Sequence, residues 1–314
     1  LEIIMKKRFL ILFLTLAVAF SCSGCAPLMD ADPETLSIYA SFYPIYALTE
    51  MIVEGVPDLT LHCLVQPQDG CLRSYSLSDW DLYMLSYGAG AIVLGGSGLE
   101  SFSDALRQSA EQTHIVVEAL TGLELAENPE IEHDETLSHW EGDNPYLYLS
   151  LDGAMGILNN LSDALSVMDP RYAEKYEANL AAVLTEMENL NAEIEAVRPL
   201  SHGKKAALLN EAMLYIAEDY EMEIAAVIPR ESGASLAQSE LENCIEQLQS
   251  GDVEIVLIEK QAPQPLIAAL ESAGFLVAQI DTMSTRRENE GGDGFFEAQR
   301  ENIQAVLNAC NQED

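Results

Sequence analysis

Residues 170–197 read PRYAEKYEANLAAVLTEMENLNAEIEAV, a stretch that lacks glycine and has its single proline at the start. Good helix formers dominate it, and apolar or aromatic side chains recur at steps of three and four residues. These side chains are Tyr172, Tyr176, Leu180, Val183, Leu184, Met187, Leu190 and Ile194. The pattern predicts one amphipathic helix of about 40 Å. We expect Pro199 to end it, because proline disrupts a helix interior.

Short apolar segments alternate with helical segments on both sides of this helix, which is typical of parallel α/β sheets. Before it, the predicted strands cover 36–41, 59–65, 91–95 and 114–117, and the predicted helices 45–54, 78–86 and 100–112. After it, the predicted strands cover 205–209, 223–227, 253–258 and 275–280, and the predicted helices 212–220, 235–250, 263–272 and 295–310. We therefore predict an α/β protein whose two parallel-sheet lobes, 36–168 and 199–314, are joined by one long rigid helix over 169–198.

The N-terminus has the pattern of a secretory signal. A basic start, Met5-Lys6-Lys7-Arg8, precedes an apolar run over 9–20 that is too short to span a bilayer. Ser23-Gly24-Cys25 resembles a bacterial lipobox, which predicts a signal peptide over 1–24 and lipidation of Cys25. Cleavage before Cys22, or a plain secretory signal, are the alternatives. Residues 25–35 would then be a lipidated tether of an extracytoplasmic protein. The lipid would be its only anchor in the cell membrane.

Composition narrows the possible partners. The chain has 15 Lys and Arg against 52 Asp and Glu, a formal net charge of −37. This excess disfavours nucleic acid, whose binding requires basic residues against phosphates. It favours solubility, and it can also enrich cations near a cleft. The sequence has no nucleophile elbow, HExxH, P-loop or Rossmann glycine set, so we do not expect an enzyme.

Four cysteines follow the predicted anchor, and we interpret them as structural because none has zinc-type spacing. Disulfides persist in exported proteins, and four cysteines allow three connectivities. Cys63 and Cys71 are close in sequence, whereas Cys244 and Cys310 lie on two late predicted helices that can be neighbours. Bridges 63–71 and 244–310 are therefore the candidates.

Several short motifs occur in an order that resembles one protein family, and the resemblance extends over nearly all of 36–314. They are Ser41-Phe42-Tyr43-Pro44, Gly98-Leu99-Glu100, Asn144-Pro145, Asp169-Pro170 and the tail pattern Gly291-Gly292-Asp293…Asn302. They resemble the zinc- and manganese-binding substrate-binding lipoproteins of ABC importers, the cluster A-I or adhesion-type receptors. The resemblance implies two α/β lobes joined by one helix, a metal ion between them and delivery to an ABC permease in the membrane. We expect a monomer.

The same resemblance implies four metal-ligand positions, of which one holds the expected residue. Arg73 stands where relatives have the His of an H-x-Y segment, and Tyr146 where they have the His of NPH. Asn210, followed by Glu211, stands where relatives have His or Glu, and Asp281 retains the family carboxylate. Arginine stays protonated and has no acceptor, so it cannot ligate a cation. The resemblance therefore implies that binding of zinc or manganese is weak, altered or lost.

Two interpretations of Arg73 follow. It can pair with Asp281 in place of the cation, with Tyr146 and Asn210 hydrogen-bonding around the pair. Alternatively, it can bind the carboxylate or phosphate of a small anionic ligand. A non-transport surface lipoprotein, adhesive or sensory, is a third possibility on the same fold.

The acidic segment 126–145 is predicted to be an exposed loop. It holds His133 and His139 among several carboxylates. These side chains could form a weak, open metal site that helps capture a cation. A solvated acidic loop without a site is the alternative.

Overall fold

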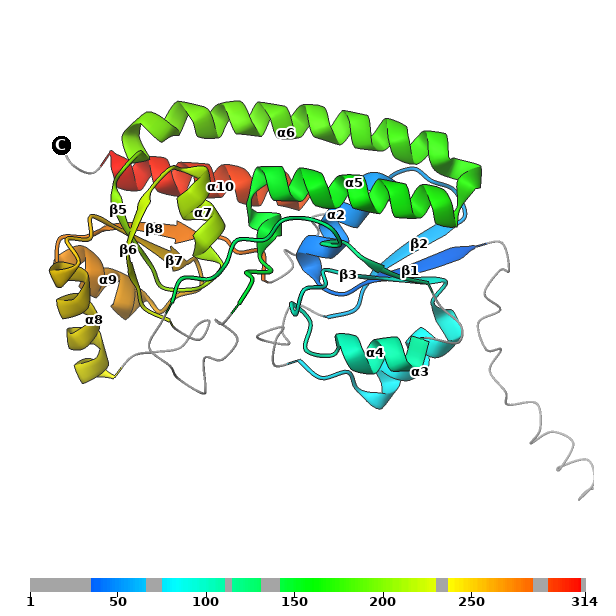
Figure 1. The fold of residues 1–314 in the computed structure, drawn as a ribbon, viewed down its shortest axis with the longest axis horizontal. Helices are drawn as coiled ribbons and strands as arrows, with labels where there is room; N and C mark the ends of the chain where they lie inside the picture. The colour runs from blue at the N-terminus through cyan, green and yellow to red at the C-terminus, as the bar shows by residue number, and fades with distance from the viewer. Residues whose placement is uncertain are drawn as a thin grey trace, which may run out of the picture. The chain divides into compact units, whose positions relative to one another are not determined.

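Two parallel sheets of four strands organise the part of the chain that the structure describes (Figure 1). The computed structural model describes residues 35–65, 75–110, 115–130, 142–229, 237–284 and 293–311. The first sheet has the order β2-β1-β3-β4, with β1 (Leu36–Ala40), β2 (Leu59–Cys63), β3 (Ala91–Leu94) and β4 (Ile115–Glu118). The second has the equivalent order β6-β5-β7-β8, with β5 (Lys205–Leu208), β6 (Glu223–Val227), β7 (Ile255–Glu259) and β8 (Leu276–Ile280). The predicted pair of parallel α/β lobes is confirmed.

The helices follow the predicted alternation. In the first half they are α2 (Tyr43–Val53), α3 (Asp79–Gly88), α4 (Ser103–Ala110) and α5 (Leu151–Met168), with a 3-10 turn η3 (Leu147–Leu149) before α5. A second 3-10 turn, η4 (Pro170–Tyr172), leads into the long helix α6 (Ala173–Ser201). The second half contains α7 (Met213–Asp219), α8 (Gln238–Ser250), α9 (Gln264–Ser272) and α10 (Asp293–Cys310).

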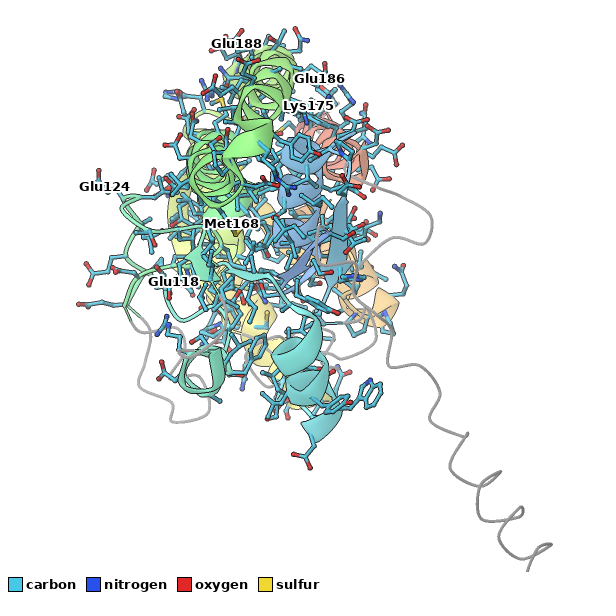
Figure 2. The ribbon with its side chains drawn as sticks, turned by 90° about the vertical axis from the view of Figure 1, so that its right-hand side faces the viewer. Glu118, Glu124, Met168, Lys175, Glu186 and Glu188 are labelled. Atoms are coloured by element: carbon cyan, nitrogen blue, oxygen red, sulfur yellow. The ribbon has the colours of Figure 1, made fainter. Side chains whose placement is uncertain are left out.

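Helix α6 is the predicted long helix, but its end differs from the prediction. It continues through Pro199 to Ser201, so the expectation that Pro199 ends it is wrong. Because proline has no N–H, Pro199 removes only one backbone hydrogen bond near the end of the helix. The amide of His202 donates to the carbonyl of Arg198 at 2.8 Å and closes the last turn. The helix packs against α2, α5 and α10, whereas Lys175 and Glu188 are on its exposed surface (Figure 2).

Helix α5 was not predicted from the sequence. It contains Gly153 and Gly156, and glycine lowers helix propensity. Gly153 is required by packing, because a Cβ there would lie 2.2 Å from the carbonyl oxygen of Leu147. Apolar residues at three- and four-residue steps, all buried, are the signal that could have identified the helix: Leu151, Ala154, Ile157, Leu158, Leu161 and Leu165.

Two of the sequence motifs meet at the carboxyl ends of β1 and β3. The Glu100 side chain is 2% exposed. It accepts hydrogen bonds from the hydroxyl of Ser41 at 2.6 Å and from the amides of Gly95 and Gly96 at 2.6 and 3.0 Å. Burial raises the pKa of Glu100, and these donors act in the opposite direction. The motif residues Ser41 and Glu100 therefore fix the ends of two strands.

The expectation that the helices carrying Cys244 and Cys310 are neighbours is wrong. Alternate residues of β5 belong to two different hydrophobic cores, one on each face of the second sheet. Cys244 on α8 is buried in the smaller core and Cys310 on α10 in the larger one. This arrangement gives a 244–310 bridge no support. Cys71 lies outside the described residues, so the 63–71 bridge stays a prediction.

The start of α5 is held by a carboxylate from the second half of the chain. Asp219, the last residue of α7, accepts hydrogen bonds from the Ser150 hydroxyl at 3.1 Å and from the Leu151 amide at 3.3 Å. Burial raises the pKa of Asp219 from 3.8 to about 6, despite these hydrogen bonds. A carboxylate at a helix N-terminus also interacts favourably with the helix dipole. Asp219 therefore connects α5 to the second sheet at the cost of burying a charge.

This buried charge gives a pH-dependent prediction for Asp219→Asn. Because the pKa of Asp219 is raised, its ionised form destabilises the folded protein. This loss of stability is complete above about pH 6 and declines as the pH falls from 6 towards 4. We expect the stability of the variant relative to wild type, measured as the difference in the free energy of unfolding, to be about 2 kcal/mol higher at pH 7.5 than at pH 4.5. Urea denaturation of both proteins at the two pH values measures this difference. An equal variant effect at both pH values would show that the pKa of Asp219 is not raised.

Candidate functional site

Three carboxylates lie at the carboxyl-end edge of the second sheet. Glu211 follows β5, Glu259 ends β7 and Asp281 follows β8. Parallel strands present their carboxyl ends at one edge, so the order of the strands brings these residues together. The Glu211 and Glu259 side chains are 2% and 8% exposed. Most of this negative charge is thus removed from solvent.

Tyr148 of η3 reaches this edge from the first half of the chain. Its hydroxyl donates to the carbonyl of Thr282 at 3.1 Å. Its pKa is raised well above the ordinary tyrosine value, first by burial and then by electrostatic interactions with Tyr146, Glu259, Asp281 and Glu211. Residues from both halves of the chain therefore share one electrostatic environment.

Tyr146 and Asn210, two of the predicted ligand positions, are both present at this edge. The Tyr146 ring lies 6.1 Å from that of Tyr148, and its backbone amide donates to Asn144 Oδ1 at 2.9 Å. Asn210 Oδ1 accepts from the Ala212 amide at 2.9 Å, and Nδ2 lies 3.4 Å from Glu259 Oε1. The amide of Asn210 is thus used in local hydrogen bonds.

Asn144, from the NP motif, links the acidic segment to the second sheet. It is fully buried, and Nδ2 donates to Asn128 Oδ1 and to the carbonyl of Glu211, both at 2.8 Å. The Tyr215 hydroxyl donates to the Asn144 carbonyl at 2.8 Å and accepts from the Ala126 amide at 3.1 Å. The motif asparagine therefore positions Tyr146 and Glu211 relative to each other. Its role was not predicted from the sequence.

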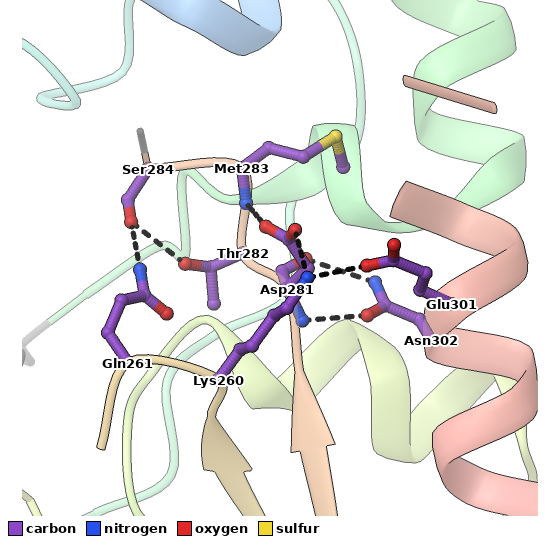
Figure 3. A network of polar contacts seen from close by, with 8 residues as sticks. All are labelled: Lys260, Gln261, Asp281, Thr282, Met283, Ser284, Glu301 and Asn302. Carbon is purple, nitrogen blue, oxygen red and sulfur yellow. Dashed lines mark hydrogen bonds and ion pairs between the residues drawn. The ribbon is translucent and has the colours of Figure 1, made fainter. Parts of the chain in front are cut away.

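Asp281, which the sequence predicts to be the retained family carboxylate, accepts and donates contacts on several sides (Figure 3). Its backbone amide donates to Asn302 Oδ1 at 2.7 Å, and its Oδ1 accepts from the Met283 amide at 2.9 Å. Oδ2 lies 3.5 Å from the ammonium of Lys260, which also lies 2.6 Å from Glu301 Oε2. Met283 has a positive φ of 55°, an unfavourable conformation for a residue with a long side chain. The sequence did not indicate Lys260 as part of the site.

The remaining predicted residues lie outside the described residues: Cys22, Cys25, Arg73, His133 and His139. The pairing of Arg73 with Asp281 and the metal site of the acidic segment therefore stay predictions. In the described ranges, no group of three or more His, Cys, Asp or Glu residues is placed to hold a metal ion. No helix in these ranges is both long and apolar enough to cross a membrane.

Together, two sheets of equivalent order, one long joining helix and a polar edge with residues from both halves define a two-lobed α/β fold. The family model described as zinc-uptake complex component A, periplasmic (ZnuA), matches residues 38–309. The chain belongs to this family, whose members are metal-binding receptors and not enzymes. The predicted resemblance is confirmed.

Individual relatives are distant. The zinc-binding protein AdcA of Streptococcus pyogenes serotype M3 is 21% identical over 96% of this chain, which spans only 61% of the AdcA length. The high-affinity zinc uptake protein ZnuA of Bacillus subtilis is 23% identical over 88% of each chain. The Zn(II)-bound ZnuA-like domain of Streptococcus pneumoniae AdcA has a TM-score of 0.73 at 19% identity, with 88% of this chain and all of that domain covered. This structural likeness supports the fold.

Proposed function

We propose that this protein is the extracytoplasmic substrate receptor of an ABC importer, in which the cargo site of the zinc and manganese receptors has been altered. Family membership and the zinc-binding relatives support a receptor role. The altered site is supported mainly by one observation, the ion pair between Asp281 and Lys260. The one retained ligand position is then already paired with a cation of the chain itself.

The residue types at the other positions favour the same conclusion. A zinc site normally has four ligands, drawn from cysteine, histidine and carboxylate. Tyr146 and Asn210 are poor zinc ligands, and the guanidinium of Arg73 repels a divalent ion. Glu211 adds one buried carboxylate at the same edge of the sheet as Asp281, which leaves the set short of four. We therefore infer weak binding of zinc or manganese in the cleft.

A small anion is the alternative cargo. It would bind through the guanidinium of Arg73, which matches a carboxylate or phosphate with two parallel hydrogen bonds. Under either cargo, we place the lipid anchor at Cys25 and the partner permease in the membrane. We assign His133 and His139 a role in cation capture only if the cleft binds a cation.

Calorimetry of the chelator-treated mature protein tests this function. Zinc, manganese and a panel of small carboxylates and phosphates are titrated, with B. subtilis ZnuA as the positive control for zinc. We expect no zinc or manganese isotherm with a Kd below about 1 μM, a binding free energy of about −8 kcal/mol. Tight one-to-one zinc binding would refute the altered site. An orphan gene without neighbouring permease and ATPase genes, together with no measurable ligand, would refute the importer role in favour of a surface protein.

A further inference from the structure

Lys260 and Asp281 lie side by side because of strand register. Strands β7 and β8 pair in parallel with Glu259 opposite Ile280, so the next residues, Lys260 and Asp281, leave the sheet together. The Lys260 amide donates to the Ile280 carbonyl at 2.8 Å, which fixes the backbone of Lys260 beside that of Asp281. The lysine is therefore a built part of this edge rather than a chance surface contact.

The Lys260 side chain bridges two carboxylates of different exposure. Its ammonium lies 3.5 Å from Asp281 Oδ2 and 2.6 Å from Glu301 Oε2 (Figure 3). The side chain of Asp281 is 13% exposed, whereas those of Lys260 and Glu301 are 50% and 49% exposed. The shorter contact is thus made to the more exposed carboxylate, on α10. The lysine can leave Asp281 and keep its contact with Glu301.

A cation that approaches Asp281 meets this ammonium. Oδ1 already accepts the Met283 amide, and the ammonium lies against Oδ2. Two positive charges a few ångströms apart repel each other, and the repulsion doubles for a divalent ion. Binding at Asp281 therefore requires the ammonium to move away from Oδ2.

We propose that Lys260 is a specificity-determining residue, a tethered counter-ion that controls how strongly Asp281 accepts a cargo cation. When a divalent ion binds, the ammonium transfers fully to Glu301, which stabilises the displaced lysine. Glu301 therefore assists cation binding, and Lys260 opposes it. This inference rests on the proposed receptor function and identifies the residue that tunes its retained carboxylate.

The test uses manganese as the probe and Met283 as a local reporter. The mature protein is labelled at its methionine methyl groups with ¹³C, and the Met283 signal is assigned through the Met283→Leu variant. Paramagnetic Mn²⁺ bound at Asp281 broadens this signal more strongly than ions bound further away, because the broadening falls steeply with distance. Wild type is compared with Lys260→Gln and Glu301→Gln. Lys205→Gln is the matched control, because Lys205 forms a similar ion pair with Asp252 at 3.4 Å on the opposite edge of the sheet.

We expect Lys260→Gln to lower the Mn²⁺ concentration for half-broadening by about tenfold, since it removes one charge repulsion near the ion. Glu301→Gln should raise that concentration, and Lys205→Gln should leave it unchanged. In the double variant Lys260→Gln, Asp281→Asn, the Mn²⁺ concentration for half-broadening should no longer be lower than in wild type.

Two results would overturn the proposal in different ways. If wild type and Lys260→Gln reach half-broadening at the same high Mn²⁺ concentration, Lys260 does not control cation binding. The proposal of an altered receptor site would still hold. Stoichiometric broadening of wild type at low micromolar Mn²⁺ would overturn both the altered receptor and the tethered counter-ion.

Discussion

The double variant Arg73→His, Tyr146→His is expected to bind zinc at least about a hundredfold more tightly than wild type, a gain of about 2.7 kcal/mol. Each change places an imidazole at a position that we predict to correspond to a ligand histidine of the family, and the first also removes a fixed positive charge. With Asp281 the cleft would then offer three zinc ligands, and Glu211 could supply a fourth. Competition against a fluorescent zinc chelator measures the affinity of the chelator-treated mature protein.

The control for this gain separates the new ligands from the lost charge. Arg73→Ala, Tyr146→Phe removes the guanidinium without adding an imidazole, and we expect less than a tenth of the gain from it. If the histidine variant binds zinc no better than this control, the positions assigned to Arg73 and Tyr146 are wrong. The two positions would then lie away from the cargo.

Asn144→Ala is expected to lower the free energy of unfolding by about 3 kcal/mol. The Asn144 side chain is fully buried, donates to Asn128 and to the Glu211 carbonyl, and accepts from the Tyr146 amide. Truncation leaves these groups without their hydrogen-bond partner. Each buried polar group left unsatisfied in this way costs about 1–3 kcal/mol. Thermal denaturation should show a fall in Tm of roughly 6–12 °C.

An exposed asparagine provides the comparison. Asn189 on α6 donates only to the Glu186 side chain at the surface, so Asn189→Ala should change stability by no more than about 0.5 kcal/mol. Tyr215→Phe removes the hydroxyl that joins the Asn144 carbonyl to the Ala126 amide, and we expect an intermediate loss. An Asn144→Ala protein as stable as Asn189→Ala would show that this network does not hold the two halves together.

Most of the fold could be predicted because its elements have strong local patterns. The strand β7 is a continuous apolar run, and α6 has a regular apolar stripe with good helix formers. Helix α5 was missed because two glycines obscure its periodicity, although Gly153 is there for a close packing contact. The end of α6 was misplaced because a proline near the last turn removes too little hydrogen bonding to stop the helix.

The site was predictable only where a residue has a fixed place relative to a strand end. Asp281 directly follows β8, and Asn210 follows β5 after one intervening residue, so both lie at one edge of the sheet. Their assignment as ligand positions stays a prediction. Lys260 was missed because its pairing with Asp281 depends on the register of β7 and β8, which no local pattern encodes. The hydrogen bonds of Asn144 were missed for a similar reason, since its partner Glu211 is 67 residues away.

Native mass spectrometry of the mature protein tests the central claim most directly. The protein is stripped with chelator, mixed with equimolar zinc and passed over a chelating resin before measurement. We predict the mass of the metal-free chain, because Asp281 is paired with Lys260 and the other positions proposed for ligands have no histidine. A mass increase of one zinc ion per chain that survives the resin would contradict this account.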